Sequence, residues 1–263
     1  MNKPLRLVIT GATGGIGREL IRVMQPYAQI MIINGLSEEN LQKLKNDLRI
    51  ENCVCIAGDV ATKRVRDNIY SAAEEHGGIN LLINNAGIND FNLLEEQSDE
   101  VVTSIINANL LAPVLLTKRL IPLLRKNKSQ IINTGSIFGY LGYPGFSVYA
   151  ASKFGLRGFA QSLRRELGDS NIIVRYFAPR ATRTPFNNSL VEQVNRETKT
   201  AMDAPQKVAK MFLKFLFKST WQKKIGFKES FFTIINDLVP SIPDAAIIKQ
   251  LPLIKKYLNR KEL

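Results

Sequence analysis

The chain has little of the chemistry on which many enzymes depend. It holds 2 cysteines, 1 histidine and 1 tryptophan among 263 residues. A single histidine, His76, excludes a histidine-based catalytic triad and any site built from several histidines. Cys53 and Cys55 are too few for a disulfide framework or a thiolate zinc site, and we interpret them as reduced core residues. The sequence therefore predicts no metal site and a cytoplasmic protein.

Long hydrophobic runs are also missing. No uninterrupted apolar run reaches the roughly 18 residues of a membrane span, and glycines cut short the apolar stretch near the N-terminus, unlike in a signal peptide. Apolar residues make up 45% of the chain and charged residues 22%, which is typical of globular proteins. The length of 263 residues allows one large domain, and we interpret residues 1–263 in this way.

Acidic residues are scarce relative to basic ones. The chain has 36 Lys and Arg against 23 Asp and Glu, a net charge of +13. Such an excess suggests an anionic partner, which is a cofactor, a membrane surface or a nucleic acid. The sequence shows no recognised nucleic-acid motif, and net charge alone gives only non-specific affinity for nucleic acids. We therefore expect no specific nucleic-acid partner.

Short apolar, β-branched runs alternate with longer amphipathic stretches. Near-continuous apolar runs are typical of strands buried on both faces. A helix is predicted over Glu38–Leu48, after a capping Ser37. The alternation predicts an α/β fold, a Rossmann-type doubly wound parallel sheet with helices on both faces. The predicted strands are Leu5–Thr10, Gln29–Asn34, Cys53–Ala57, Ile79–Asn84, Gln130–Thr134 and Ile172–Phe177.

A glycine-rich segment, TGATGGIG at residues 10–17, joins the first predicted strand to a helix-like stretch. Gly11 allows a tight turn, while Gly15 and Gly17 let the backbone approach a diphosphate and let the helix pack close to the strand. The helix N-terminus then favours negative charge. Glycines alone often mark a mere turn, but the order of strand, glycines and helix favours dinucleotide binding.

Further motifs follow along the chain: Asp59-Val60 after the third strand, NNAG at 84–87, Asn109 in NANLLAP, Ser136, and YAASK at 149–153. With the glycine segment, they make the chain resemble the short-chain dehydrogenase/reductase superfamily, in its single-domain branch. The resemblance covers about residues 5–210. It implies an NAD(P)-dependent oxidoreductase that transfers hydride reversibly between nicotinamide and a carbonyl or alcohol, and that forms a homo-oligomer.

Tyr149 and Lys153 are the expected acid–base pair. Reduction of a carbonyl needs a proton donor and the reverse reaction needs a base. Because the two residues are spaced i, i+4 on one helix face, we expect the lysine to lower the pKa of the tyrosine from about 10. Ser136 can hydrogen-bond the substrate oxygen, and the resemblance implies that Asn109 helps hold Lys153 through a water. Singly these residues are typical of surface pairs and helix caps, but their joint spacing favours catalysis.

The resemblance also implies the cofactor-binding positions. Strand two ends in Gly35-Leu36-Ser37 and lacks the acid that binds the ribose 2′-hydroxyl in NAD-preferring members. We therefore expect NADP or NAD, with a preference for NADP. Arg180 replaces the usual glycine after Pro179, where it either disturbs the nicotinamide loop or reaches the cofactor phosphates. The full set is Gly11, Thr13, Gly15, Ile16, Gly17, Gly35, Ser37, Asp59, Val60, Asn85, Ala86, Gly87, Tyr149, Lys153, Pro179, Thr182 and Thr184.

The C-terminal part combines charge with apolar residues. Residues 180–204 form a polar stretch without clear secondary structure, interpreted as a substrate loop, and residues 207–263 form a basic, apolar extension. An amphipathic helix is predicted over Ala245–Leu258, kinked or restarted at Pro252. The extension fits either a pocket cover or a peripheral element at the inner membrane face. We favour a cover for Phe231–Val239 and the membrane for the last fifteen residues.

No motif encodes the substrate. The candidate pocket residues suggest a hydrophobic carbonyl or alcohol, such as a lipid or acyl compound. The alternative functions are a non-catalytic dinucleotide-binding sensor and a membrane-peripheral scaffold, and the intact Ser136, Tyr149 and Lys153 argue against the sensor. The candidate pocket residues are Asp90, Phe91, Tyr140, Leu141, Tyr143 and Phe186.

Overall fold

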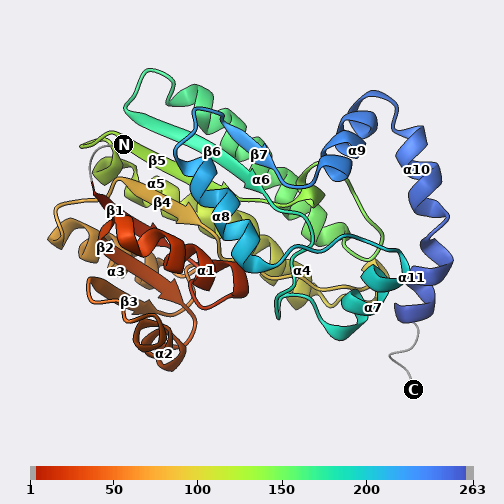
Figure 1. Cartoon of the computed structure of the whole chain (residues 1–263), viewed down its shortest axis with the longest axis horizontal. Coiled ribbons are helices and arrows are strands. Elements are labelled where there is room, and N and C mark those ends of the chain that lie inside the picture. The colour runs from red at the N-terminus through yellow and green to blue at the C-terminus, as the bar shows by residue number, and fades with distance from the viewer. Residues whose placement is uncertain (1–3, 259–263) are drawn as a thin grey trace.

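A parallel sheet forms the centre of the molecule (Figure 1). The computed structural model describes residues 4–258. Its seven strands lie in the order β3-β2-β1-β4-β5-β6-β7, and every neighbouring pair is parallel. The first six strands coincide with the predicted apolar runs. The strands are β1 (Leu5–Ile9), β2 (Ala28–Gly35), β3 (Cys53–Ala57), β4 (Leu81–Asn84), β5 (Ser129–Thr134), β6 (Ile172–Ala178) and β7 (Gln222–Lys224).

Helices cover both faces of the sheet, as predicted. Along β1, Leu7 packs in one apolar cluster with residues of α1, α2 and α8, while Val8 packs in another with residues of α3, α5 and α6. Successive side chains of a strand point to opposite faces, so a strand covered on both sides is apolar throughout. These helices are α1 (Gly15–Met24), α2 (Glu38–Leu48), α3 (Lys63–Glu75), α5 (Ala112–Leu124), α6 (Ser147–Glu166) and α8 (Pro205–Leu216).

The strand order places the ligand site. The chain runs outward from β1 to β2 and β3, and then returns to the other side of β1 with β4. Such a reversal leaves a crevice at the carboxyl ends of the strands, where open α/β sheets bind ligands. The glycine-rich segment follows β1 and the NNAG motif spans the end of β4, so both lie at this crevice.

The helix over Asp99–Leu124 is long and apolar enough to cross a membrane, although no uninterrupted apolar run marks it in the sequence. It consists of α4 (Asp99–Ile106), a π turn η3 (Asn107–Leu111) and α5. Leu116, Leu120 and Leu123 belong to the cluster beneath the sheet. We therefore interpret it as a core helix whose first half lies at the surface.

Strand β7 and helix α8 belong to the sheet and its covering layer, although the sequence analysis placed them in the C-terminal extension. Arg175 on β6, 1% exposed, fixes them in place. Its guanidinium donates to the carbonyls of Phe215 and Leu216 at the end of α8 and to that of Thr220 before β7. A cation at a helix C-terminus is stabilising. The separate extension therefore begins after β7.

The loop over residues 180–204 contains a helix that the sequence analysis missed, α7 (Ser189–Glu197). Asn188 caps it by accepting from the Val191 amide. Val191 and Val194 are buried together with residues of α11 (Leu251–Leu258). The sequence marks this helix weakly, because its two buried apolar residues, Val191 and Val194, are only one helical turn apart.

Three helices form a projection at one side of the molecule: α9 (Phe227–Leu238), α10 (Ser241–Ile248) and α11 (Figure 1). The chain restarts as a helix at Leu251 beside Pro252, as expected. In residues 249–258 the side chains of Ile254, Tyr257 and Leu258 are buried against α7, so these apolar residues contact protein, and the membrane contact of the last fifteen residues stays a prediction. Residues 259–263 lie outside the described part. Short turns complete the chain: η1 (Gln25–Tyr27), η2 (Leu94–Glu96) and η4 (Ile137–Gly139).

Candidate active site

A cavity of about 780 Å³ opens at the carboxyl ends of the strands. Every residue predicted to bind the cofactor lines it, from Gly11 on the glycine-rich segment to Thr184 on the substrate loop. Ser136 lines it too, whereas Asn109 lies behind the wall and is fully buried. The lining residues run from Gly11 to Gln250, so the tertiary fold brings together segments that are far apart in sequence.

The glycine-rich segment has no room for side chains. Gly11 has a φ of +64°, and a Cβ there would lie 2.7 Å from the Ala86 Cα. A Cβ on Gly17 would lie 2.1 Å from the Gly11 carbonyl oxygen, and one on Gly15 would overlap the Thr184 side chain. Gly14, before helix α1, provides no side-chain cap. The first amides of α1 therefore face the cavity without competition from a capping side chain, as a diphosphate site requires.

Thr10 joins the glycine-rich segment to the NNAG motif. Its Oγ1 accepts hydrogen bonds from the Asn85 and Ala86 amides at 3.1 and 3.0 Å. The Asn85 Nδ2 donates to the carbonyls of Thr10 and Gly11, both at 3.2 Å. The ends of β1 and β4 are thereby tied together. The sequence analysis quoted Thr10 within the motif but gave it no role.

The end of β2 forms the wall expected to face the ribose. Gly35 ends the strand, Leu36 is 75% exposed, and the Ser37 hydroxyl caps α2 by accepting from the Asn40 amide at 3.3 Å. A hydroxyl that accepts keeps its own proton free to donate. This wall of the cavity carries no carboxylate at Gly35, Leu36 or Ser37.

Tyr149 and Lys153 project from α6 into the cavity and are 8% and 4% exposed. The Lys153 Nζ donates to the Thr134 carbonyl at 3.1 Å and lies 5.6 Å from the centroid of the Tyr149 ring. Burial raises the pKa of Tyr149 to about 12, and a hydrogen bond with Ser136 acts in the opposite direction. The expected lowering of the Tyr149 pKa by Lys153 is therefore wrong, because burial is the largest cause of the shift and the lowering contribution comes from Ser136. Burial also lowers the pKa of Lys153 to about 8.

Asn109 lies in the π turn η3, a local irregularity that often marks functional positions. Its carboxamide is fully engaged. The Oδ1 accepts from the Ile88 amide at 2.8 Å, and the Nδ2 donates to the Ile88 carbonyl at 2.9 Å and to Ser152 Oγ at 3.0 Å. Ser152 donates in turn to the Tyr149 carbonyl at 2.6 Å. Asn109 thus contacts helix α6 through Ser152, a residue that the sequence analysis did not single out.

The far end of the cavity is apolar. Phe91, Leu141, Tyr143 and Phe186 line it as expected. Tyr140 and Asp90 do not, and their assignment to the pocket is wrong. The Tyr140 hydroxyl donates to Gln222 on β7 at 2.7 Å, and Asp90 accepts from Gln97 at 3.0 Å. Phe232 on α9 lines this end too, within the segment Phe231–Val239 that was expected to cover the pocket, and Ile247 on α10 is a lining residue that the sequence analysis missed.

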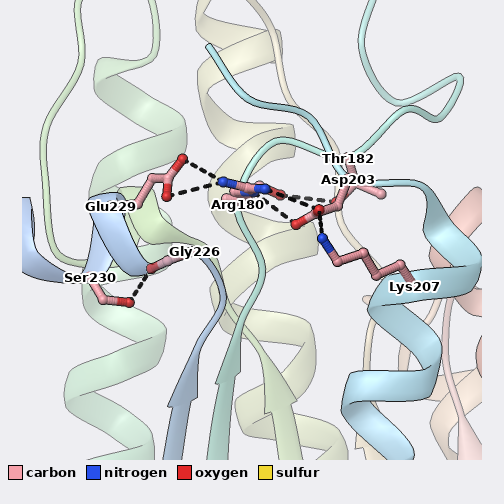
Figure 2. Close-up of polar contacts among 7 residues, drawn as sticks. All are labelled: Arg180, Thr182, Asp203, Lys207, Gly226, Glu229 and Ser230. Carbon is pink, nitrogen blue, oxygen red and sulfur yellow. Dashed lines mark hydrogen bonds and ion pairs between the residues drawn. The ribbon is translucent and has the colours of Figure 1, made fainter.

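Arg180 lines the cavity, but its guanidinium is held by protein carboxylates (Figure 2). Nε and Nη2 donate to Asp203 at 2.8 and 3.1 Å, and Nη1 donates to Glu229 at 3.0 Å. Lys207 also reaches Asp203, at 2.8 Å. The suggestion that Arg180 reaches cofactor phosphates is wrong for this arrangement, because its donors already point at two carboxylates.

Comparisons with known proteins agree with this geometry. A model of the family described as short chain dehydrogenase matches residues 6–195. The chain is 34% identical over 187 residues to the 3-oxoacyl-[acyl-carrier-protein] reductase FabG of Rickettsia felis, covering 71% of this chain and 76% of the relative. It is 32% identical over 200 residues to the nodulation protein G of a Rhizobium species, covering 76% and 80%.

Solved structures show the same fold. A short chain dehydrogenase from Burkholderia cenocepacia in complex with NADP superposes with a TM-score of 0.80 at 20% identity, covering 93% of this chain and 98% of the other. A relative from Burkholderia phymatum in complex with NAD gives 0.82 at 17% identity, covering 92% and 96%. The family match, the relatives and the assembled Ser136, Tyr149 and Lys153 lead to one conclusion. The chain belongs to the short chain dehydrogenase family of oxidoreductases.

Proposed function

We propose that the protein reduces an apolar carbonyl compound with NADPH and oxidises the corresponding alcohol with NADP. The observation that carries the proposal is one cavity with two ends. Its first end has the crowded glycine-rich segment and the open amides of α1, and its second end is apolar, with Tyr149 and Ser136 between them. When bound, the nicotinamide supplies or accepts a hydride.

Tyr149 is the proposed proton donor in reduction. A carbonyl that gains a hydride becomes an alkoxide, and the proton on Tyr149 completes the alcohol, so that one hydride and one proton are consumed for each carbonyl. A tyrosine whose pKa burial raises to about 12 carries that proton at neutral pH. Ser136 is placed to donate to the same oxygen. Lys153 supplies positive charge behind the ring, and Asn109 fixes the start of the catalytic helix through Ser152.

An acyl compound is the proposed substrate. The side chains of Phe91, Leu141, Phe186 and Phe232 give the second end of the cavity an apolar wall. An apolar wall of this kind suits a hydrocarbon chain better than a polar ligand. Curated relatives named 3-oxoacyl-[acyl-carrier-protein] reductase support the 3-oxoacyl class.

NADP is the proposed partner at the ribose wall. Gly35 lines the cavity without a side chain, and the Ser37 hydroxyl keeps a proton to donate to a 2′-phosphate. None of the three positions Gly35, Leu36 and Ser37 carries an acid that would repel a 2′-phosphate or accept a hydrogen bond from the 2′-hydroxyl of NAD. We expect a modest preference rather than an absolute one.

The reaction is tested with purified protein, NADPH or NADH, and a series of 3-oxoacyl thioesters, simple ketones and aldehydes, by following cofactor absorbance. The proposal expects turnover that increases with the length of the apolar chain and that is faster with NADPH. A dinucleotide sensor without catalysis would bind the cofactor and consume none. Binding without turnover across the whole series would therefore contradict the proposal.

We also propose a homo-oligomer. Only 33% of the residues in the most apolar stretch of the helix Asp99–Leu124 are buried. Leu111 in this helix and Phe154 on the adjoining α6 are exposed by 44% and 41%. A second copy that covers this face would remove them from water. Sedimentation velocity should give a dimer or larger species, and Phe154→Glu should shift it towards the monomer. A monomeric wild type would contradict this.

A peripheral contact with an anionic membrane is proposed for the projection rather than for the last residues. On α9 the side chains of Phe227, Phe231, Ile234 and Leu238 recur at helical spacing and are exposed by 89%, 58%, 49% and 76%. Such a stripe on one helix face is unusual for a surface in water. Ile242 and Ile248 extend it onto α10. We define these six residues as the α9–α10 stripe.

The positive charge around the α9–α10 stripe favours an anionic membrane over a second copy of this chain as its partner. Segment 223–258 carries six lysines against three acids, and Lys228, Lys249, Lys255 and Lys256 are exposed. Two such surfaces would repel each other, whereas each lysine near an anionic bilayer contributes about 1 kcal/mol. The inner side of the same helices lines the apolar end of the cavity, so an acyl substrate would enter from the lipid side.

The membrane contact is tested by co-sedimentation of the full chain with phosphatidylglycerol vesicles at low and high salt. We expect salt-sensitive binding that Phe231→Ser combined with Leu238→Ser abolishes. Ile173→Ser is the matched control, because Ile173 is 56% exposed on β6, away from the stripe. Equal recovery of wild type and double variant in the supernatant would contradict the proposal. So would self-association without vesicles that the double variant removes.

A further inference from the structure

The ion pairs of Arg180 close the base of the substrate loop. Arg180 and Asp203 lie near the two ends of segment 180–204. Beside their paired side chains, the Arg183 amide donates to the Asp203 carbonyl and the Asp203 amide to the Ala181 carbonyl, both at 2.9 Å. Asp203 is 3% exposed, and hydrogen bonding from Arg180 lowers its pKa. The two ends of the loop are therefore joined by a buried, charged contact.

The third contact of Arg180 reaches α9, and the chain makes room for it. Gly226, directly before the helix, has a φ of +98°. A Cβ there would lie 2.1 Å from Glu229 Oε2 and 3.0 Å from Arg180 Cδ. Figure 2 shows Gly226 beside the pair. Glu229 sits in the first turn of α9, where a carboxylate is favoured by the helix dipole. The Arg180–Glu229 contact thus depends on the absence of a side chain at residue 226.

The two segments joined in this way form different walls of the cavity. Thr182 and Thr184, beyond Arg180, line the cofactor end, and Thr184 packs against Gly15 of the glycine-rich segment. The Thr182 hydroxyl donates to the Arg180 carbonyl at 2.9 Å. Phe232, one turn after Glu229, lines the apolar end. The Arg180 guanidinium therefore lies between the wall at the cofactor end and the wall at the apolar end of the cavity.

We propose that Arg180 is a positioning residue that couples the substrate loop to α9, so that both walls of the cavity are held in one geometry. The proposal rests on the proposed function for the ligands of the two walls. Arginine suits the position because its planar fork serves two carboxylates at once, which an ammonium group does not do with the same geometry.

The two halves of the coupling differ in strength. Asp203 is buried and accepts two bonds from the guanidinium, whereas Glu229 is 24% exposed and contacts Nη1 alone. More exposed ion pairs contribute less than buried ones with two hydrogen bonds. The Arg180–Glu229 ion pair is therefore the weaker of the two and breaks before the Arg180–Asp203 pair. This break releases α9 and the apolar wall while the substrate loop stays closed at its base.

Hydrogen exchange of the full chain without cofactor tests the coupling directly. Arg180→Gly should speed amide exchange by roughly tenfold in both 181–203 and 227–238, and Glu229→Gln only in 227–238. Arg180→Lys retains the charge but not the fork, so it should behave like Glu229→Gln. Lys207→Gln is the matched control, because it removes the 60% exposed cation from the same Asp203. It should change neither segment.

Strand β4 is the internal reference for global unfolding. A uniform change that includes Leu81–Asn84 would show a general loss of stability and would overturn the coupling. Unchanged exchange of 227–238 in Arg180→Gly would overturn it as well. So would equal effects of Glu229→Gln on both segments.

Calorimetric titration with NADP separates this proposal from the proposed function. Arg180→Gly should raise the Kd for NADP by about fivefold to tenfold, the equivalent of about 1–1.4 kcal/mol. Glu229→Gln and Lys207→Gln should leave it unchanged. If the wild type binds neither NADP nor NAD, the proposed function fails, while the exchange pattern still decides the coupling. If the wild type binds NADP and the exchange pattern is absent, the coupling fails alone.

Discussion

Replacing Lys153 by methionine should make the protein more stable at neutral pH while it removes turnover. Lys153 is 4% exposed, and the hydrogen bond of its ammonium goes to the Thr134 carbonyl. Burial lowers its pKa from 10.5 to about 8. Each pH unit of difference corresponds to about 1.4 kcal/mol. Below the folded pKa, the protein therefore carries a buried charge at a cost of about 3 kcal/mol.

Methionine has a similar length and no charge, but it leaves the Thr134 carbonyl without its donor. A buried acceptor that loses its partner costs about 1–2 kcal/mol. The net gain of Lys153→Met at pH 7 is therefore about 1–2 kcal/mol. Above pH 8 the folded lysine loses its proton while the unfolded one keeps it, so the wild type gains stability as the pH rises towards 10.5. The advantage of the variant should shrink over the same interval.

Urea unfolding of both proteins at neutral pH and near pH 10 measures this difference. Lys256→Met, at an exposed lysine on α11, is the control and should change stability little at either pH. A Lys153→Met protein less stable than the wild type at pH 7 would refute the reasoning. So would a difference that stays constant as the pH rises.

Three further changes test other parts of the site. Tyr149→Phe should lower turnover by about 10²–10⁴-fold through loss of the acid, with the affinity for NADP retained in calorimetry. Gly35→Asp should shift preference from NADP to NAD in steady-state kinetics, because the carboxylate would repel a 2′-phosphate and bind the 2′-hydroxyl. The position accepts a side chain, since its Cβ meets only the side-chain ends of Leu41 and Thr13, at 3.3 Å. Gly17→Ala should abolish NADP binding and destabilise the fold by about 1–3 kcal/mol, seen in thermal unfolding, because its Cβ would meet a backbone oxygen.

The sequence predicts those parts of the fold that depend on local pattern. Strands β1 to β6 are apolar because helices cover both faces of the sheet, and the Ser37 cap before α2 follows from local chemistry alone. Strand β7 has the sequence Gln-Lys-Lys and pairs only along its edge with β6, so no apolar pattern marks it. Its position is set by Arg175 and by the path of α8, which are tertiary effects.

Site residues could be predicted where a motif fixes both the residue type and its position at a strand end or on one face of a helix. Two of these motifs, the glycine-rich segment and NNAG, lie at the ends of strands, and Tyr149 and Lys153 lie one turn apart on α6. These local positions are enough to place all of them at the cavity. Tyr140 was misplaced because its ring turns towards Gln222, 82 residues away. The partners of Arg180 lie 23 and 49 residues further along the chain, so no spacing rule reveals them.

Burial determined the pKa of Tyr149 against the sequence expectation. The i, i+4 spacing of Tyr149 and Lys153 predicted that the ammonium group would lie beside the phenol and lower its pKa. In the folded chain the Lys153 ammonium turns to the Thr134 carbonyl, and three aromatic rings surround the phenol with centroid distances of 5.9, 6.2 and 6.3 Å. The surroundings of a side chain depend on distant segments, so the direction of such a shift needs the structure.

Transfer of a labelled hydride tests the central claim most directly. NADPH that carries deuterium at both hydrogens of the nicotinamide C4 would be incubated with a 3-oxoacyl thioester and the wild-type protein, and the product analysed by mass spectrometry. The account predicts a 3-hydroxyacyl product with one deuterium on the carbon that bears the new hydroxyl, and little product from Tyr149→Phe despite bound cofactor. A product without deuterium, or equal product from both proteins, would contradict it.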